Sequence, residues 1–80
     1  MSEPLTLDRV RADVAELLYL EPSDVDDSAD LLGEGLDSVR ILSLVERWRL
    51  TGVEITFIEL AERPTVLAWW QLLSGRLSDG

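Results

Sequence analysis

Apolar residues recur at helical spacing in three separate stretches of this chain. Positions i, i+3, i+4 and i+7 share one face of a helix, so each stretch predicts an amphipathic helix with one buried side. Eighty residues leave room for one small domain around one core, which we expect to span residues 1–80. The three apolar stripes are Leu7, Val10, Val14, Leu17 and Leu18; Ile41, Leu44, Val45 and Trp48; and Val66, Trp69, Trp70, Leu73 and Leu77.

Capping and breaking residues set the ends of these helices. Thr6 is a suitable N-cap for the first helix, and Pro22 should end it within a residue or two of Leu20. Thr56 and Glu59 have the spacing of a capping box, which predicts a further helix that Pro64 must stop after one or two turns. The fold class is therefore an all-α bundle of three main helices and one short helix. We expect the helices at about residues 6–20, 38–51, 56–62 and 65–77.

The connection between the first two helices is long and acidic. Connections longer than about 12 to 15 residues are uncommon in compact domains and tend to be functional or disordered. Apolar residues within this loop should pin it to the core, although it could also serve only to solvate the domain. Its acids are Glu21, Asp24, Asp26, Asp27, Asp30, Glu34 and Asp37, and its expected anchors are Val25, Leu31, Leu32 and Leu36.

Composition excludes several classes of function. The chain has no cysteine and no histidine, so it cannot form a disulfide framework, a Ser-His or Cys-His nucleophile, or a thiolate or imidazole metal site. We therefore expect no catalytic residue, no metal site and no enzyme activity. A net charge of -9 argues against nucleic acid. With no apolar run near the roughly 20 residues that span a bilayer, and no signal peptide in Met1–Pro4, we expect a cytoplasmic monomer without a membrane contact.

Ser38 stands where the acidic loop ends and the second helix begins, after Gly33 and Gly35. A phosphate ester at a helix N-terminus is stabilised by about 0.3 to 1 kcal/mol at an exposed site. Because the chain cannot activate this hydroxyl itself, the position favours modification by another enzyme, with an ordinary N-cap as the alternative. Asp37 is open to two interpretations: it could be the cap, or it could help a modifying enzyme hold a divalent metal.

Apolar residues outside the stripes surround this serine. Val39 lies nearly opposite the centre of the second stripe and Leu42 lies on its flank. The short helix contains Phe57, Ile58, Leu60 and Ala61, which cannot all face inward from one or two turns. These residues predict a contact surface beside Ser38, or scattered surface hydrophobes of no special role.

Asp37-Ser38 resembles the Asp-Ser attachment motif of carrier proteins, the small acidic four-helix domains that hold acyl groups on a phosphopantetheine arm. Over roughly residues 31 to 77, the chain is more specifically similar to the aryl carrier domains of catechol and salicylate siderophore synthetases. The segments that carry this resemblance are Gly35–Arg40, Arg47–Arg49, Ile55–Phe57, Pro64-Thr65, Ala68–Trp70 and Leu72–Ser74.

The resemblance implies that Ser38 receives 4'-phosphopantetheine from coenzyme A through a phosphopantetheinyl transferase, with Asp37 assisting at the transferase's magnesium. The arm would accept salicylate or 2,3-dihydroxybenzoate as a thioester from an aryl-acid adenylating enzyme and deliver it to a condensation or cyclisation domain of nonribosomal siderophore biosynthesis.

In such domains partner contacts are made from positions that match Leu42, Phe57 and Ala61, with Val39 beside them. Val39 replaces the leucine of many acyl and peptidyl carriers, which favours the aryl class. A peptidyl or acyl carrier and an unmodified acidic interaction module remain alternatives.

Overall fold

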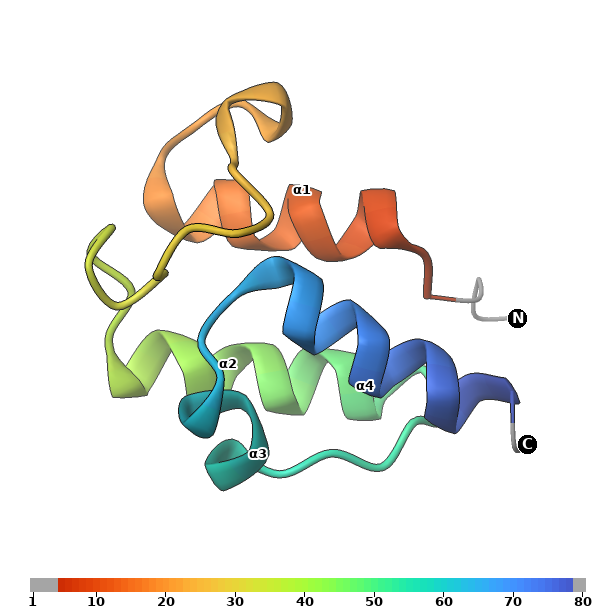
Figure 1. Cartoon of the computed structure of the whole chain (residues 1–80). Helices are drawn as coiled ribbons and strands as arrows, with labels where there is room; N and C mark the ends of the chain where they lie inside the picture. Colours follow the sequence, from red (N-terminus) through yellow and green to blue (C-terminus); the bar gives the residue numbers. More distant parts are fainter. Residues whose placement is uncertain (1–4, 79–80) are drawn as a thin grey trace.

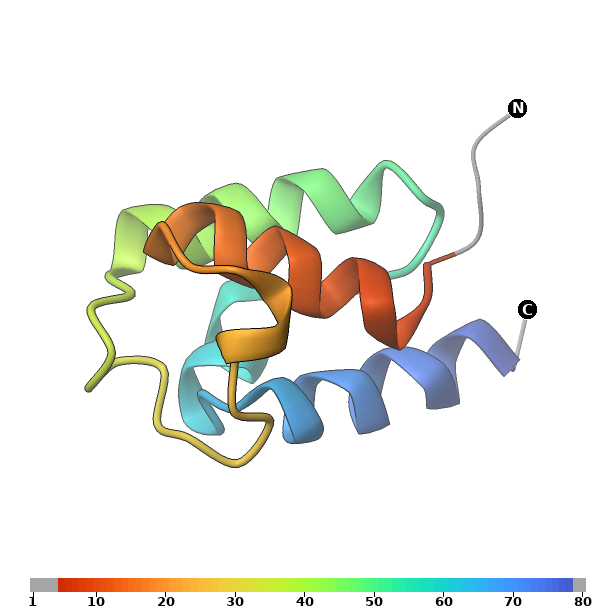
Figure 2. The same cartoon turned by 90° about the horizontal axis from the view of Figure 1, so that it is seen from above.

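The computed structural model describes residues 5–78, which form an all-α bundle without strands. Its elements are α1 (Leu7–Leu18), the 3₁₀ turn η1 (Pro22–Asp24), α2 (Ser38–Arg49), α3 (Phe57–Glu62) and α4 (Val66–Ser78). The beginning of α2 lies beside the end of α1, at the opposite end of the bundle from the start of α1 and the end of α4 (Figures 1 and 2). Among the helices of residues 5–78, none is long and apolar enough to cross a membrane.

The first helix ends at Leu18, within two residues of the expected end near Leu20. Thr6 caps it as expected, with its hydroxyl accepting from the Arg9 N–H at 3.2 Å. At its end, Tyr19 turns into the left-handed region at φ 59° and closes the helix after Leu18. Pro22 does not break α1 but begins the separate turn η1. The other helices begin or end within one or two residues of the expected positions.

The core is built from the apolar stripes. All four residues of the α2 stripe are buried: Ile41, Leu44, Val45 and Trp48. Val10 and Val14 of α1 are also buried, whereas Leu7, Leu17 and Leu18 are partly buried around the core. In α4 the stripe buries Val66, Trp69 and Leu73 and half-buries Trp70, and the side chain of Leu77 lies outside the described part.

The two central tryptophans meet edge to face, with ring centroids 5.9 Å apart and an interplanar angle of 71°. Trp69 Nε1 donates to the Leu60 carbonyl at 2.8 Å, so the indole of α4 also satisfies a backbone group of α3. Both indoles therefore act as core residues.

A buried carboxylate links α1 to α2. Asp13 is almost fully buried and accepts from Trp48 Nε1 at 2.8 Å, Arg47 Nη1 at 3.1 Å and Arg9 Nε at 3.2 Å. These three hydrogen bonds, two of them from arginines, are what make a buried charge tolerable. This interaction was not among the expectations from sequence.

The acidic loop is pinned to the bundle at several points. Leu31 and Leu36 are buried and Val25 packs against the core, but Leu32 is exposed, so the expectation that Leu32 anchors the loop is wrong. Backbone bonds add two further ties, from Leu31 N–H to the Pro64 carbonyl at 2.8 Å and from Leu67 N–H to the Asp27 carbonyl at 2.9 Å. The loop therefore has a defined path up to the start of α2.

Candidate functional site

Asp37 is the N-cap of α2, and Ser38 is its first helical residue. Asp37 has extended backbone at φ −112° and ψ 177°, and its Oδ1 accepts from the Arg40 N–H at 2.9 Å. This arrangement answers the question that the sequence left open: the cap is the aspartate, and the interpretation of Ser38 as an ordinary N-cap is wrong. The Ser38 hydroxyl is not needed to begin the helix.

The chain reaches Ser38 through a tight turn. Leu36 N–H donates to the Leu31 carbonyl at 3.0 Å, and Gly35 between them has a φ of +112°, which favours glycine over any residue with a Cβ. Because Leu36 is then buried in the core, the two residues that follow it emerge at the end of the bundle. The turn and the anchor together fix where the helix starts.

Ser38 itself is exposed, and within residues 5–78 its hydroxyl forms no hydrogen bond. The first N–H groups of a helix have no partner inside the helix. At α2 the Arg40 N–H is satisfied by Asp37, while the Ser38 and Val39 N–H groups form no hydrogen bond within the described range. An accessible hydroxyl next to two free donors fits an attached phosphate ester.

Arg40 is the charged neighbour of this site. Its Nη1 donates to Asp37 Oδ2 at 3.1 Å, so both oxygens of the Asp37 carboxylate are engaged by Arg40, one through the backbone and one through the guanidinium. The sequence interpretation gave Arg40 no role, although it is the only base between residues 12 and 46. That isolation was the signal that could have identified it.

Exposed apolar side chains flank Ser38. Val39 is 75% exposed and Leu42 is 48% exposed, in agreement with their positions off the α2 stripe. In α3, which packs against α2, Leu60 is buried, Phe57 and Ala61 are half-buried, and Ile58 is 65% exposed. At about 100° per residue Ile58 lies opposite Leu60. The sequence interpretation placed Phe57 and Ala61 in the partner surface and missed Ile58. With Leu60 taken as the core residue of α3, the helical spacing would have predicted that Ile58 is exposed.

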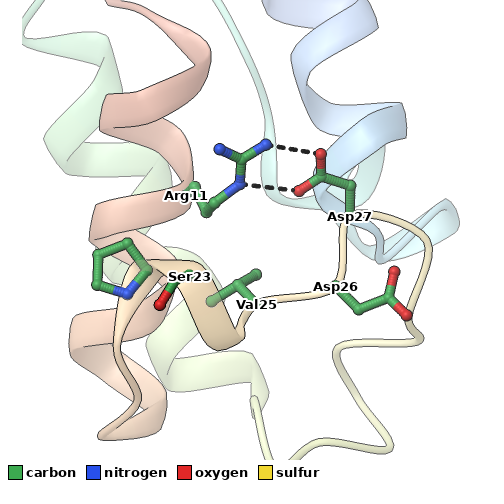
Figure 3. A pocket seen from close by; sticks show the side chains of 6 residues that line it. Arg11, Ser23, Val25, Asp26 and Asp27 are labelled. Carbon is green, nitrogen blue, oxygen red and sulfur yellow. Dashed lines mark hydrogen bonds and ion pairs between the residues drawn. The ribbon is translucent and has the colours of Figure 1, made fainter.

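Two ion pairs shape the surface away from Ser38. Arg11 donates through Nε and Nη2 to both oxygens of Asp27, at 3.0 and 2.7 Å (Figure 3). This hydrogen bonding by Arg11 lowers the pKa of Asp27 below its ordinary value. The pair borders an open hollow of about 360 Å³ under the acidic loop, and Ser38 is not part of its lining.

The second pair joins α4 to α3, where Arg76 binds both carboxylate oxygens of Glu59. Hydrogen bonding from Arg76 lowers the pKa of Glu59, whose Oε1 also accepts from the Thr56 N–H in the complete capping box. Among residues 5–78, no three acidic side chains converge to hold a metal ion.

The structure is thus a four-helix bundle with an exposed serine at the start of its second helix. Residues 8–73 match the family model described as "Phosphopantetheine attachment site", so the chain belongs to that family. It is a phosphopantetheine carrier domain, a non-catalytic shuttle, as its resemblance to carrier proteins implied. Such a domain works with a phosphopantetheinyl transferase and with assembly-line enzymes.

Individual relatives agree with this class. The acyl carrier protein ScoB of Streptomyces coeruleorubidus is 57% identical over 76 residues, covering 95% of this chain and 89% of ScoB. The phenyloxazoline synthase MbtB of Mycobacterium sp. (strain MCS) is 49% identical over 70 residues, which are 88% of this chain but 6% of that much longer protein.

A solved structure supports the fold. The HMG-ACPI domain of the CurA module of Lyngbya majuscula matches with a TM-score of 0.67 at 23% identity, covering 94% of this chain and 88% of that domain. The expected four-helix carrier fold is therefore confirmed.

Proposed function

We propose that Ser38 bears the phosphopantetheine arm and that the domain carries an aryl acid. The observation that supports this most directly is the exposed, unbonded hydroxyl of Ser38 at the first position of α2, directly after the capping Asp37. Membership of a phosphopantetheine attachment family calls for one accessible hydroxyl. Ser38 has this accessibility, and free N–H groups for a phosphate lie beside it.

Attachment uses the chemistry of a visiting enzyme. The Ser38 oxygen forms a bond to the phosphorus of coenzyme A that carries pantetheine, and the bond from that phosphorus to adenosine 3',5'-bisphosphate breaks. The Ser38 proton leaves to a base on the transferase, because this chain has no histidine to accept it. Asp37, directly before Ser38, has an exposed carboxylate that would serve as an oxygen ligand for the transferase's Mg²⁺. When bound, phosphopantetheine supplies a flexible arm whose terminal thiol carries the cargo as a thioester.

The cargo assignment is supported by resemblance. The segments from Gly35 to Ser74 are similar to aryl carrier domains, and one relative is named for a phenyl-bearing product. We therefore propose salicylate or 2,3-dihydroxybenzoate as cargo, an aryl-acid adenylating enzyme as donor, and a condensation or cyclisation domain of siderophore biosynthesis as acceptor. The lack of cysteine fits a reducing cytoplasm, where we expect the domain to act as a monomer.

The proposed partner surface consists of Val39, Leu42, Phe57 and Ala61, to which the structure leads us to add Ile58. These side chains belong to α2 and α3, the two helices that pack together beside Ser38. Their exposed apolar area would be covered when a partner enzyme docks over the arm.

A second candidate is an acyl carrier, because the relative ScoB is named as an acyl carrier protein and is similar over nearly its whole length. The two candidates share Ser38 and the arm. They differ in the enzyme that loads the thiol, which makes them separable by experiment.

Attachment is tested by incubating the apo protein with coenzyme A, Mg²⁺ and a promiscuous phosphopantetheinyl transferase, followed by intact-mass measurement. We expect a gain equal to one phosphopantetheine in the native protein and none in Ser38→Ala. The matched control is Ser43→Ala, which removes an exposed hydroxyl from the same helix and should load normally. A gain that survives Ser38→Ala would contradict the assignment of Ser38.

Cargo is tested on the loaded protein. An adenylating enzyme specific for aryl acids and one specific for an aliphatic acyl or amino acid are supplied separately, and thioester formation is followed by mass. We expect faster loading with the aryl acid. Preferential loading with the aliphatic acid would replace the aryl assignment by the second candidate and would leave the role of Ser38 intact.

A further inference from the structure

The guanidinium of Arg40 lies over the first turn of α2. Its bond to Asp37 Oδ2 holds it there at 3.1 Å, with the Arg40 side chain 36% exposed and that of Asp37 56% exposed. Helical side chains lean toward the helix N-terminus, so this orientation is also the one that Arg40 prefers. The positive charge of Arg40 therefore lies at the N-terminal end of α2, the end at which Ser38 is the first residue.

The surrounding charge is negative. Asp30, Glu34 and Asp37 precede Ser38, and Arg40 is the only base that the sequence places between residues 12 and 46. A phosphodiester on Ser38 would add one more negative charge directly beside Asp37. Like charges at such a short separation repel, so a cation shared between them would stabilise the modified state.

Arg40 has donors to spare. A guanidinium carries five N–H donors in a rigid fork, and within residues 5–78 the Arg40 side chain bonds only to Asp37. Side chains two residues apart do not face each other on a helix surface. A phosphate on Ser38 would extend beyond the serine oxygen, and the Arg40 guanidinium bonds to Asp37, the residue directly before Ser38. The fork of an arginine suits both carboxylates and phosphates, and its five donors allow it to bond to more than one group.

We propose that Arg40 binds the phosphodiester on Ser38 while keeping its bond to Asp37, and so orients the first part of the arm. Arg40 is then a positioning residue. It exchanges no atom with the cargo but limits the directions in which the arm leaves α2. This inference rests on the proposed attachment at Ser38.

The test compares apo and loaded forms of the native protein and of Arg40→Gln, with loading verified by intact mass. Thermal unfolding is measured at low salt. The expected result is that Arg40→Gln lowers the unfolding midpoint of the loaded form by about 2–4 °C more than that of the apo form, the shift expected for an exposed ion pair in a domain of this size. The extra loss should shrink when salt is added, and Arg40→Lys should retain part of the stabilisation.

The ³¹P resonance of the loaded protein gives a second readout. Arg40→Gln should shift it, whereas the control Arg49→Gln, an exposed base at the far end of α2, should leave it in place. Equal losses in apo and loaded forms with an unchanged resonance would show that Arg40 only supports the Asp37 cap, which would overturn the inference. A failure of Ser38 to load would instead be seen directly as the absence of a mass gain, and it would overturn the proposed function.

Discussion

Asp13 is the only buried charged side chain among residues 5–78, and its loss should lower stability markedly. Replacing Asp13 by alanine should lower the free energy of unfolding by about 2–3 kcal/mol. The main part comes from Trp48 Nε1, a buried donor that bonds to Asp13 at 2.8 Å and would be left without a partner, at a cost of about 1–3 kcal/mol. Arg9 and Arg47 are 54% and 33% exposed, so water replaces much of what they lose and each adds less than about 1 kcal/mol.

Urea unfolding followed by circular dichroism at neutral pH measures this difference. Asp13→Asn keeps an oxygen for Trp48 but loses the charge, so it should cost roughly half as much as the alanine variant. The matched control is Glu16→Ala, which removes a carboxylate that pairs with the same Arg47 at 3.4 Å but is 67% exposed. That control should lose no more than about 1 kcal/mol.

The thermal midpoint offers an independent measure. A loss of 2–3 kcal/mol corresponds to a decrease of about 10–20 °C for a domain of this size. If Asp13→Ala and Glu16→Ala lowered the midpoint equally, water would have to reach the Trp48 indole in the variant. The conclusion that this part of the core is closed would then be wrong.

Three further predictions concern other parts of the chain. Hydrogen bonding by Arg11 lowers the pKa of Asp27, so the pair stabilises the fold fully above the ordinary aspartate pKa of 3.8 and loses this effect as the pH falls through the lower pKa of the folded state. Asp27→Asn should therefore flatten the fall of the unfolding midpoint below about pH 4. Parallel midpoint curves for the variant and the native protein would exclude this role. Gly35→Ala, at φ +112° with open space around it, should cost about 1–2 kcal/mol in urea unfolding from backbone strain alone, while the helical control Gly75→Ala should cost nothing. Leu42→Ala should slow transfer of cargo to a partner while changing the free energy of unfolding by less than about 0.5 kcal/mol. The Phe57 side chain packs against the core, so Phe57→Ala should lower both the transfer rate and the stability. Unfolding of Leu42→Ala would place the Leu42 side chain in the core.

Local signals in the sequence predicted most of the helical framework. The α2 stripe is buried at every position, and the capping box at Thr56 and Glu59 forms both of its hydrogen bonds. These features depend on residues three or four apart, whose relative positions are fixed by the helix itself. The same spacing predicted the exposed side of α2, because a residue that lies off a well-defined apolar stripe faces the surface.

Sequence patterns missed the features that depend on contacts between residues far apart in the chain. Asp13 is bonded to residues 34 and 35 positions away, and nothing local shows those partners, although a charge at a stripe position three residues after Val10 was a warning. Tyr19 closes α1 in the left-handed region that glycine and asparagine favour, so no local signal marks this residue as the cap. Leu32 is exposed, whereas Leu31 and Leu36 of the same turn are buried, and nothing local distinguishes the three leucines.

At the start of α2, the residues that support the fold are neighbours of the serine proposed for modification. Leu36 is buried and anchors the loop, and Asp37 caps the helix through the Arg40 N–H. Ser38 takes no part in either, since its hydroxyl forms no bond within residues 5–78. The proposed modification of Ser38 would therefore break no hydrogen bond of that hydroxyl within residues 5–78. This separation explains why an aspartate before the serine is useful even before any metal is considered: it removes from the serine the capping role that a helix start would otherwise give it.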